Sequence, residues 1–169
     1  MPFTGIPITW LILWVICYNR RLQEIGGWLL FYYIQLYMGI GATLLLLPFT
    51  IDNLLPSRWG GAPGRYALAL LGTLPLFAIF VMQAIVAHRL RRSRDAVYLV
   101  RLRRVLWASL AIVVLRIAID LKVFSIDLFL DGWTLLWTAA WLPYFYRSIR
   151  VGHVFVTKDW ARVAALVVD

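Results

Sequence analysis

The run from Ile25 to Leu47 contains one strongly polar side chain, that of Gln35. The hydrocarbon core of a bilayer is about 30 Å thick, and a helix needs roughly 20 consecutive apolar residues to cross it. Three later runs, 66–87, 105–124 and 132–146, are also nearly free of charge and rich in aliphatic and aromatic residues. A helix bonds its backbone groups within the segment itself, as lipid requires. The sequence therefore predicts an all-α integral membrane protein with a bundle of four core transmembrane helices.

Composition supports the same fold class. Hydrophobic residues make up 63% of the 169 and charged residues 15%, whereas an average soluble domain has roughly 25% charged residues. The links between the runs are short, which leaves no room for a separate catalytic domain. We predict an apolar segment over residues 1–24 that ends in a basic turn, a four-span membrane domain over 25–156, and a short amphipathic segment over 157–169.

The amino-terminal segment leaves the number of spans open. Ile6 to Tyr18 is apolar on all sides but only thirteen residues long, which is too short to cross unless the helix extends at one end. A fifth span and a re-entrant or membrane-buried segment both fit this pattern. A cleaved secretory signal does not, because the positive charges at Arg20 and Arg21 follow the apolar run instead of preceding it.

The carboxyl-terminal segment has the spacing of a short amphipathic helix. Apolar side chains recur there at helical intervals, and Asp159 precedes them as a possible N-cap. Such a stripe suits either a membrane surface or a partner subunit. The stripe consists of Trp160, Val163, Ala164, Val167 and Val168.

The net charge of +9 follows membrane topology and gives no reason to expect nucleic acid as a partner. Seven arginines lie between His88 and Arg104, against one acid, Asp95. By the positive-inside rule, we expect this loop and the carboxyl terminus to be cytoplasmic in a multi-pass membrane protein. The arginines either set the topology alone or also bind anionic phospholipids. They are Arg89, Arg91, Arg92, Arg94, Arg101, Arg103 and Arg104.

Charged groups inside the predicted spans are candidates for function, because an ionisable side chain in hydrocarbon is costly and usually paired. Arg116 and Asp120 are four residues apart and can meet on one helix face. They indicate either an ion or proton pathway or a local ion pair, with Asp127 or Asp131 as further acids within reach of an extended arginine. Gln35 and Gln83 favour interhelical hydrogen bonds over substrate contacts. These two glutamines lie in the first and second predicted spans.

Small and aromatic residues predict surfaces for helix packing and for partners. Glycines let membrane helices approach closely, and tryptophans four residues apart lie along one helix face. The aromatic face could instead stack a pigment or a quinone. The predicted packing residues are Gly26, Gly27 and Gly39 in the first span and Trp133, Trp137 and Trp141 in the last.

Catalytic, metal and cofactor sites find little support in the sequence. His88 and His153 are the only histidines, and neither has the cysteines or carboxylates of a metal site beside it. A lipid-modifying enzyme would have to use these histidines with Asp95 or Asp159. We therefore expect no catalytic residues, no metal and no cofactor, and a protein that is not an enzyme.

Two motifs at the ends of the four-span region resemble a known family. Ile25-Gly26-Gly27-Trp28-Leu29-Leu30 opens the first span, and Trp141-Leu142-Pro143-Tyr144-Phe145 closes the last, followed by Ser148, Arg150, Val151 and Phe155. Together they resemble the bacterial membrane family called Domain of Unknown Function 2569, over residues 25–156. The resemblance implies a four-helix inner-membrane protein with both ends of the core cytoplasmic and no assigned catalytic residues. The apolar amino terminus and the longer tail depart from the family pattern.

Taken together, these features predict a non-catalytic accessory or scaffold subunit of a larger bacterial inner-membrane assembly. Its expected partners are other membrane-protein subunits and anionic phospholipids. The alternative is a small membrane transporter or channel component, in which Arg116, Asp120, Gln35 and Gln83 would line a shared cavity.

Overall fold

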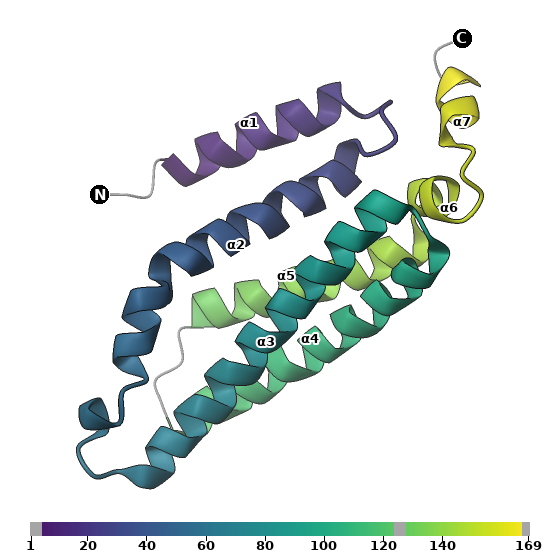
Figure 1. The fold of residues 1–169 in the computed structure, drawn as a ribbon. Helices are drawn as coiled ribbons and strands as arrows, with labels where there is room; N and C mark the ends of the chain where they lie inside the picture. Colours follow the sequence, from purple (N-terminus) through teal and green to yellow (C-terminus); the bar gives the residue numbers. More distant parts are fainter. Residues whose placement is uncertain (1–4, 124–127, 167–169) are drawn as a thin grey trace. The chain divides into compact units, whose positions relative to one another are not determined.

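The computed structural model describes residues 5–123 and 128–166, with side chains described over 10–52, 54–121 and 132–165. Throughout these residues the regular elements are helical (Figure 1). This confirms the all-α prediction for the part of the chain that the structure describes. The helices are α1 (Gly5–Asn19), α2 (Gly27–Asn53), the 3₁₀ helix η1 (Pro56–Trp59), α3 (Pro63–Ser93), α4 (Ala96–Val123), α5 (Leu128–Arg147), α6 (Ile149–Phe155) and α7 (Trp160–Leu166).

The chain forms two compact units, which are described separately. The first joins the described residues up to Gly39 with those from Ser148 onward, and the second runs from Ile40 to Arg147. Helix α2 contributes to both, because the division falls between Gly39 and Ile40. The predicted boundaries at 24/25 and 156/157 stay a prediction.

The second unit is built on an antiparallel pair of helices, α3 and α4, with α5 packed against α4 (Figure 1). Buried residues of α4 recur at alternating intervals of three and four: Leu99, Leu102, Leu106, Ser109 and Val113. This spacing keeps one seam of a helix facing its neighbour. On α3 the buried residues are Gly72, Ile79, Ala87 and Leu90.

The link between α3 and α4 is much shorter than the sequence suggested. The residues from His88 to Arg104 were expected to form a loop, but α3 continues to Ser93 and α4 begins at Ala96. Arg94 ends α3 in the left-handed conformation, with φ of 52°, and its N–H donates to the Leu90 carbonyl. The Asp95 carboxylate then accepts from the N–H of Val97 at 2.9 Å. The basic segment is thus a helical hairpin, since charge alone does not interrupt a helix.

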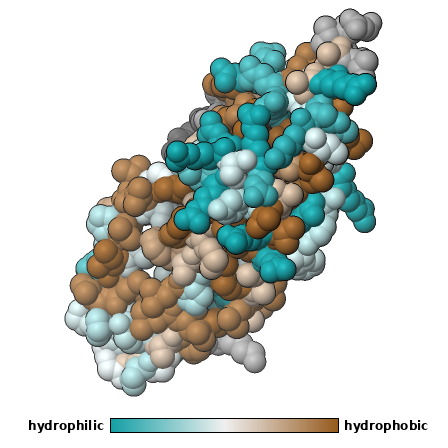
Figure 2. Space-filling view, turned by 45° about the vertical axis from the view of Figure 1, so that its right-hand side comes forward, coloured by the Kyte–Doolittle hydropathy of each residue, from teal (hydrophilic) through white to brown (hydrophobic). Residues whose placement is uncertain are grey.

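Two described helices are long and apolar enough to cross a membrane, α2 over Gly27–Asp52 and α3 over Pro63–Ser93. Helix α4 carries more charge than these two helices. Any stretch of 18 residues in α4 that includes both Arg116 and Asp120 also includes Arg104 or Lys122, and so contains at least three charged side chains. Large apolar side chains are exposed on several helices, among them Leu45 at 78% and Phe49 at 68%. Figure 2 shows broad hydrophobic areas open on the visible face.

The first unit contains α1, the amino-terminal part of α2, α6 and α7. Trp10 of α1 contacts Phe31 of α2, with ring centroids 5.4 Å apart. Helix α6 begins after Ser148, whose hydroxyl accepts a hydrogen bond from the N–H of Val151. A short polar segment then leads to α7.

Candidate functional sites

The charged pair predicted on α4 forms a direct but long contact. Arg116 Nε donates to Asp120 Oδ2 at 3.4 Å, and the two side chains are 43% and 20% exposed. A Cβ atom added at Gly72 of α3 would lie 4.0 Å from Arg116 Cγ, so the arginine stem passes over the glycine. The side chains of Asp127 and Asp131, named as further acids, lie outside the described residues. The arrangement is an ion pair along one helix beside α3.

The two glutamines have different surroundings. Gln83 of α3 accepts a hydrogen bond from the hydroxyl of Ser109 on α4, at 3.3 Å. Ser109 is 5% exposed and belongs to the seam of buried α4 residues, so this contact joins the two helices as interhelical polar residues do in membranes. Gln35 lies on α2 in the other unit, and its buried Oε1 has no hydrogen-bond partner among the described residues.

One arginine of the basic segment binds inside the chain. Arg103 of α4 donates from Nε and Nη2 to the carbonyl oxygen of Phe145 on α5, at 3.0 and 2.7 Å. Its guanidinium also lies 4.6 Å from the centre of the Tyr146 ring. Phe145 is in the last turn of α5, where carbonyls lack partners within the helix and the helix dipole favours a positive charge. Arg103 therefore caps α5.

The other six arginines of this segment are exposed at the α3–α4 hairpin: Arg89, Arg91, Arg92, Arg94, Arg101 and Arg104. Arg101 lies over the Tyr98 ring, one helical turn away, with its guanidinium carbon 5.2 Å from the ring centre. The sequence analysis gave all seven arginines the same role. In the structure Arg103 caps α5, and the other six are surface charges.

A contact that sequence reasoning missed joins the two ends of the first unit. Arg150 of α6 donates from Nη1 to the carbonyl of Gln23 at 3.0 Å and from Nη2 to the carbonyl of Arg21. The same guanidinium lies 4.2 Å from the centre of the Trp160 ring of α7. Trp160 in turn donates from Nε1 to the carbonyl of Leu22 at 3.1 Å. Arg150 and Trp160 therefore bind the turn between α1 and α2.

The glycines at this turn have local roles that differ from the predicted packing face. A Cβ at Gly26 would lie 1.8 Å from the carbonyl oxygen of Arg20, which no side chain can tolerate. Gly27 has φ of +56° and faces the Arg150 guanidinium, 3.7 Å from a Cβ built there. Both positions serve the turn and the arginine, because glycine allows the close approach at residue 26 and takes the positive φ at residue 27 without steric cost.

The tryptophans of α5 contact one another in order along the helix. The Trp133 and Trp137 rings are stacked with centroids 5.7 Å apart, and Trp137 meets Trp141 edge to face at 5.5 Å. Their exposure is graded, from 49% at Trp133 to 6% at Trp141. Trp141 packs inside the chain, so only the Trp133 end of the row is open to lipid or to a partner.

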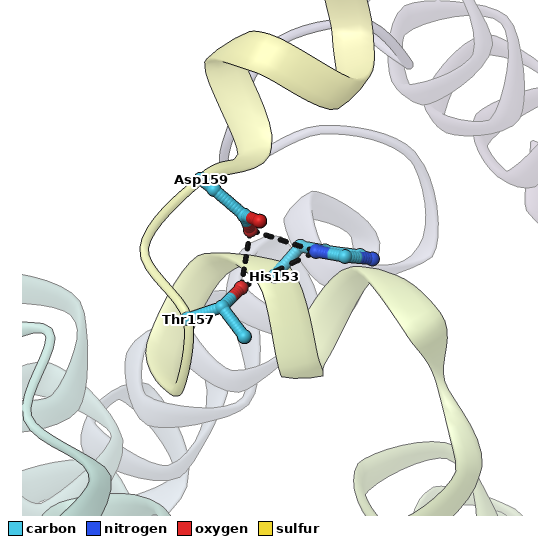
Figure 3. Close-up of polar contacts among 3 residues, drawn as sticks. All are labelled: His153, Thr157 and Asp159. Atoms are coloured by element: carbon cyan, nitrogen blue, oxygen red, sulfur yellow. Dashed lines mark hydrogen bonds and ion pairs between the residues drawn. The ribbon is translucent and has the colours of Figure 1, made fainter.

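His153, Thr157 and Asp159 gather between α6 and α7 (Figure 3). His153 Nδ1 lies 2.7 Å from Asp159 Oδ1, and the Thr157 hydroxyl donates to the same oxygen. The Thr157 hydroxyl, and after it the His153 ring, lower the pKa of the Asp159 carboxyl below its ordinary value of 3.8. Asp159 stands at the predicted N-cap position of α7, where its backbone carbonyl accepts from the N–H groups of Arg162 and Val163. Its side chain contacts His153 and Thr157.

The Asp159 carboxylate is the shared acceptor of this cluster, because the Thr157 hydroxyl donates to it. An ionised carboxylate only accepts, so the Nδ1 nitrogen facing it carries a hydrogen. Among the described side chains, no three of His, Cys, Asp and Glu gather as a metal site would require. The cluster therefore fixes the link between two short helices.

Comparison with known proteins agrees with the two terminal motifs. Residues 22–156 match the model of the family described as "Protein of unknown function (DUF2569)". No curated protein and no solved structure matches the chain. The matched region begins at the turn that Arg150 binds and includes Arg150 itself, and this match over most of the chain shows that the protein belongs to the DUF2569 family.

Proposed function

We propose that this protein is a four-span, non-catalytic scaffold subunit of a larger bacterial inner-membrane assembly. In this proposal α2, α3, α4 and α5 cross the bilayer, and α1 is an additional membrane-buried segment. The hairpin between α3 and α4 faces the cytoplasm, as does the carboxyl-terminal segment with α6 and α7. The exposed arginines of the hairpin support this orientation, because cytoplasmic segments carry the excess of basic residues.

The observation that carries the proposal is the distribution of polar and apolar groups in the second unit. Gln83 bonds Ser109, Arg116 bonds Asp120, and Arg103 bonds the Phe145 carbonyl. The first contact joins α3 to α4, the second lies within α4 and the third joins α4 to α5. Large apolar side chains remain exposed on the same helices. A surface of this kind offers packing contacts, and it favours a structural role over a polar pathway for a transported solute.

The test is mild extraction of the tagged protein from its native membrane, followed by native-gel sizing and mass spectrometry of the accompanying proteins. The proposal predicts a stoichiometric complex with other membrane subunits. A monomer or small homo-oligomer that persists in lipid-preserving extraction would contradict it. In that case the carrier alternative would become the better account, with Arg116 as the first residue to replace.

A matched pair of glycine substitutions locates the interface. A Cβ at Gly41 of α2 or at Gly64 of α3 would meet nothing within 4 Å among the described residues, and both positions are exposed, so we expect a leucine at either position to extend outward. Gly41 lies within α2 and Gly64 at the start of α3. If a partner packs closely on the small surface of α2, Gly41→Leu dissociates the complex and Gly64→Leu does not. An unchanged complex in both variants would place the interface away from Gly41.

A further inference from the structure

One face of α4 combines two arginines with a long exposed apolar stripe. Arg101 and Arg104 are exposed near the amino-terminal end of the helix, and Trp107 follows one turn later at 55% exposure. Val114 and Leu115 continue the exposed face two turns further on. At 100° per residue these positions lie within a quarter turn of Arg104. The buried seam at Leu102, Leu106 and Ser109 is on the opposite side of the helix.

The dimensions of this face match one leaflet of a bilayer. Eleven residues separate Arg104 from Leu115, which is about 16 Å along the helix axis. Half of the hydrocarbon core is about 15 Å thick. Trp107 lies about 4.5 Å further along the helix axis into the membrane than Arg104. This places Trp107 at the boundary between headgroups and acyl chains, where tryptophan is enriched.

The direction of α4 favours its arginines over those of α3. Helical side chains lean toward the amino terminus of their helix. Because α4 begins at the basic end, Arg101 and Arg104 lean toward the headgroups. Arg89 and Arg92 of α3 lie at the carboxyl-terminal end of a helix that runs the other way, so they lean back toward the apolar span. Contact with the Tyr98 ring also restricts Arg101 before any ligand binds.

We propose that this face of α4 is a binding site for one anionic phospholipid. The guanidinium groups of Arg101 and Arg104 hold the phosphate, because arginine matches phosphate geometry with two parallel N–H bonds. Trp107 packs at the glycerol level, and Val114 and Leu115 contact an acyl chain. Arg103 takes no part, because it caps α5. The site rests on the proposed function, in which α4 crosses the bilayer from a cytoplasmic hairpin; cysteine labelling before and after α3 tests that orientation of the hairpin separately.

The experiment uses the full chain purified in detergent and titrated with phosphatidylglycerol, with native mass spectrometry reporting the bound lipid. The site predicts that phosphatidylglycerol binds more tightly than phosphatidylcholine, whose headgroup has no net charge. Arg101→Gln with Arg104→Gln should weaken phosphatidylglycerol binding at least about 10-fold. Arg89→Gln with Arg92→Gln removes the same amount of charge from α3 and should weaken phosphatidylglycerol binding less than about 3-fold. Equal losses in the two double variants, or no loss in either, would overturn the site.

Two further arms separate a lipid from a free phosphate ion. Trp107→Ala should weaken phosphatidylglycerol binding, because it removes a contact that only a lipid makes. Inorganic phosphate at the same concentration should neither displace the lipid nor protect the protein against heat; displacement at equal concentration would overturn the lipid assignment. If the glutamine pair does not fold, Arg101→Lys with Arg104→Lys keeps the charge and loses the paired N–H geometry. Unchanged lipid affinity in that lysine variant would contradict arginine-specific phosphate binding.

Discussion

At the residue scale, two arginines show how a positive side chain in this protein serves the backbone. Arg103 donates two hydrogen bonds to the Phe145 carbonyl, and Arg150 donates one each to the carbonyls of Gln23 and Arg21. All three acceptors lie where a helix ends or a turn begins, so their carbonyls lack the usual helical partner. The rigid fork of the guanidinium suits such pairs of bonds better than the single ammonium of lysine.

Arg150→Lys should therefore loosen the carboxyl-terminal segment. Lysine cannot reach two carbonyls in the same geometry while also stacking on Trp160, and hydrogen bonds from a charged donor contribute about 1.5–3 kcal/mol when well formed. Because the contact is exposed, we expect the lower part of that range. Trypsin should then cleave after Lys158 about 10-fold faster. Arg147→Lys, at an exposed arginine, is the control, and equal cleavage rates in both variants would refute this role for Arg150.

Asp159 makes the link between α6 and α7 sensitive to acid. The hydroxyl of Thr157 and the ring of His153 lower its pKa below 3.8, so the folded form binds a proton less readily than the unfolded form. The stabilisation is present above pH 3.8 and is lost as the pH falls through the lower folded value. As the pH falls through this range, hydrogen exchange over residues 157–163 should become faster, relative to the Asp159→Asn variant at each pH. Thr157→Val removes the largest cause of the lowered Asp159 pKa, so in that variant the rise in exchange should occur at a higher pH, closer to 3.8.

At the element scale, the α3–α4 hairpin is defined by its seam and its turn. Buried α4 residues at intervals of three and four face α3, and Ser109 in that seam bonds Gln83. The turn consists of Arg94 and Asp95, between two helices of 31 and 28 residues. A left-handed conformation at Arg94 closes α3 directly and lets α4 start within two residues. A glycine normally takes this position, so the turn holds a strained residue.

Arg94→Gly should stabilise the hairpin, because the left-handed conformation costs about 1–2 kcal/mol for a residue with a Cβ. The greater freedom of glycine in the unfolded chain offsets about 0.4–1 kcal/mol of this gain. Arg91→Gly is the matched control, since the same substitution inside α3 should destabilise by about 1 kcal/mol. Thermal unfolding in detergent, followed by circular dichroism, measures both. Destabilisation of similar size at both positions would contradict the strain at Arg94.

At the scale of the whole molecule, the matched family region begins and ends in the same unit. Its amino-terminal limit at residue 22 lies in the turn bound by Arg150 and Trp160, and Arg150 lies near its other limit at residue 156. The glycines of the first motif and the residues Ser148 and Arg150 that follow the second therefore have a shared physical role. The Gly-Gly pair makes room for the turn and the arginine, and Ser148 starts the helix that carries the arginine.

The proposed orientation predicts opposite labelling of two serines on either side of the α3 span, Ser57 in η1 and Ser93 at the last residue of α3. In a Cys17→Ala background, an impermeant thiol reagent should label Ser93→Cys only from the cytoplasmic side and Ser57→Cys only from the periplasmic side. Both serines are exposed, and the substitution is nearly isosteric. Labelling of both from the same side would show that α3 does not cross, and reversed labelling would overturn the orientation.

The sequence by itself determined the helices, because the length and the apolar character of a run are local properties of the chain. The length of each run can be compared directly with the thickness of a bilayer. The four apolar runs from residue 25 onward all lie largely in helices. The sequence analysis was wrong in expecting a loop for the basic segment. A cluster of positive charge indicates the side of the membrane on which a segment lies, but it does not indicate the backbone conformation. The Arg116–Asp120 contact needed only the four-residue spacing of one helix.

Only the tertiary structure decided which distant groups meet. Arg103 bonds a carbonyl 42 residues away, and Arg150 bonds one 127 residues away. Every residue carries a carbonyl, so a sequence does not indicate which ones a helix end leaves without a partner, or which arginine will reach them. The sequence placed the charges on the helices, and the packing of those helices determined that Arg103 became a cap while Arg101 and Arg104 remained on the surface.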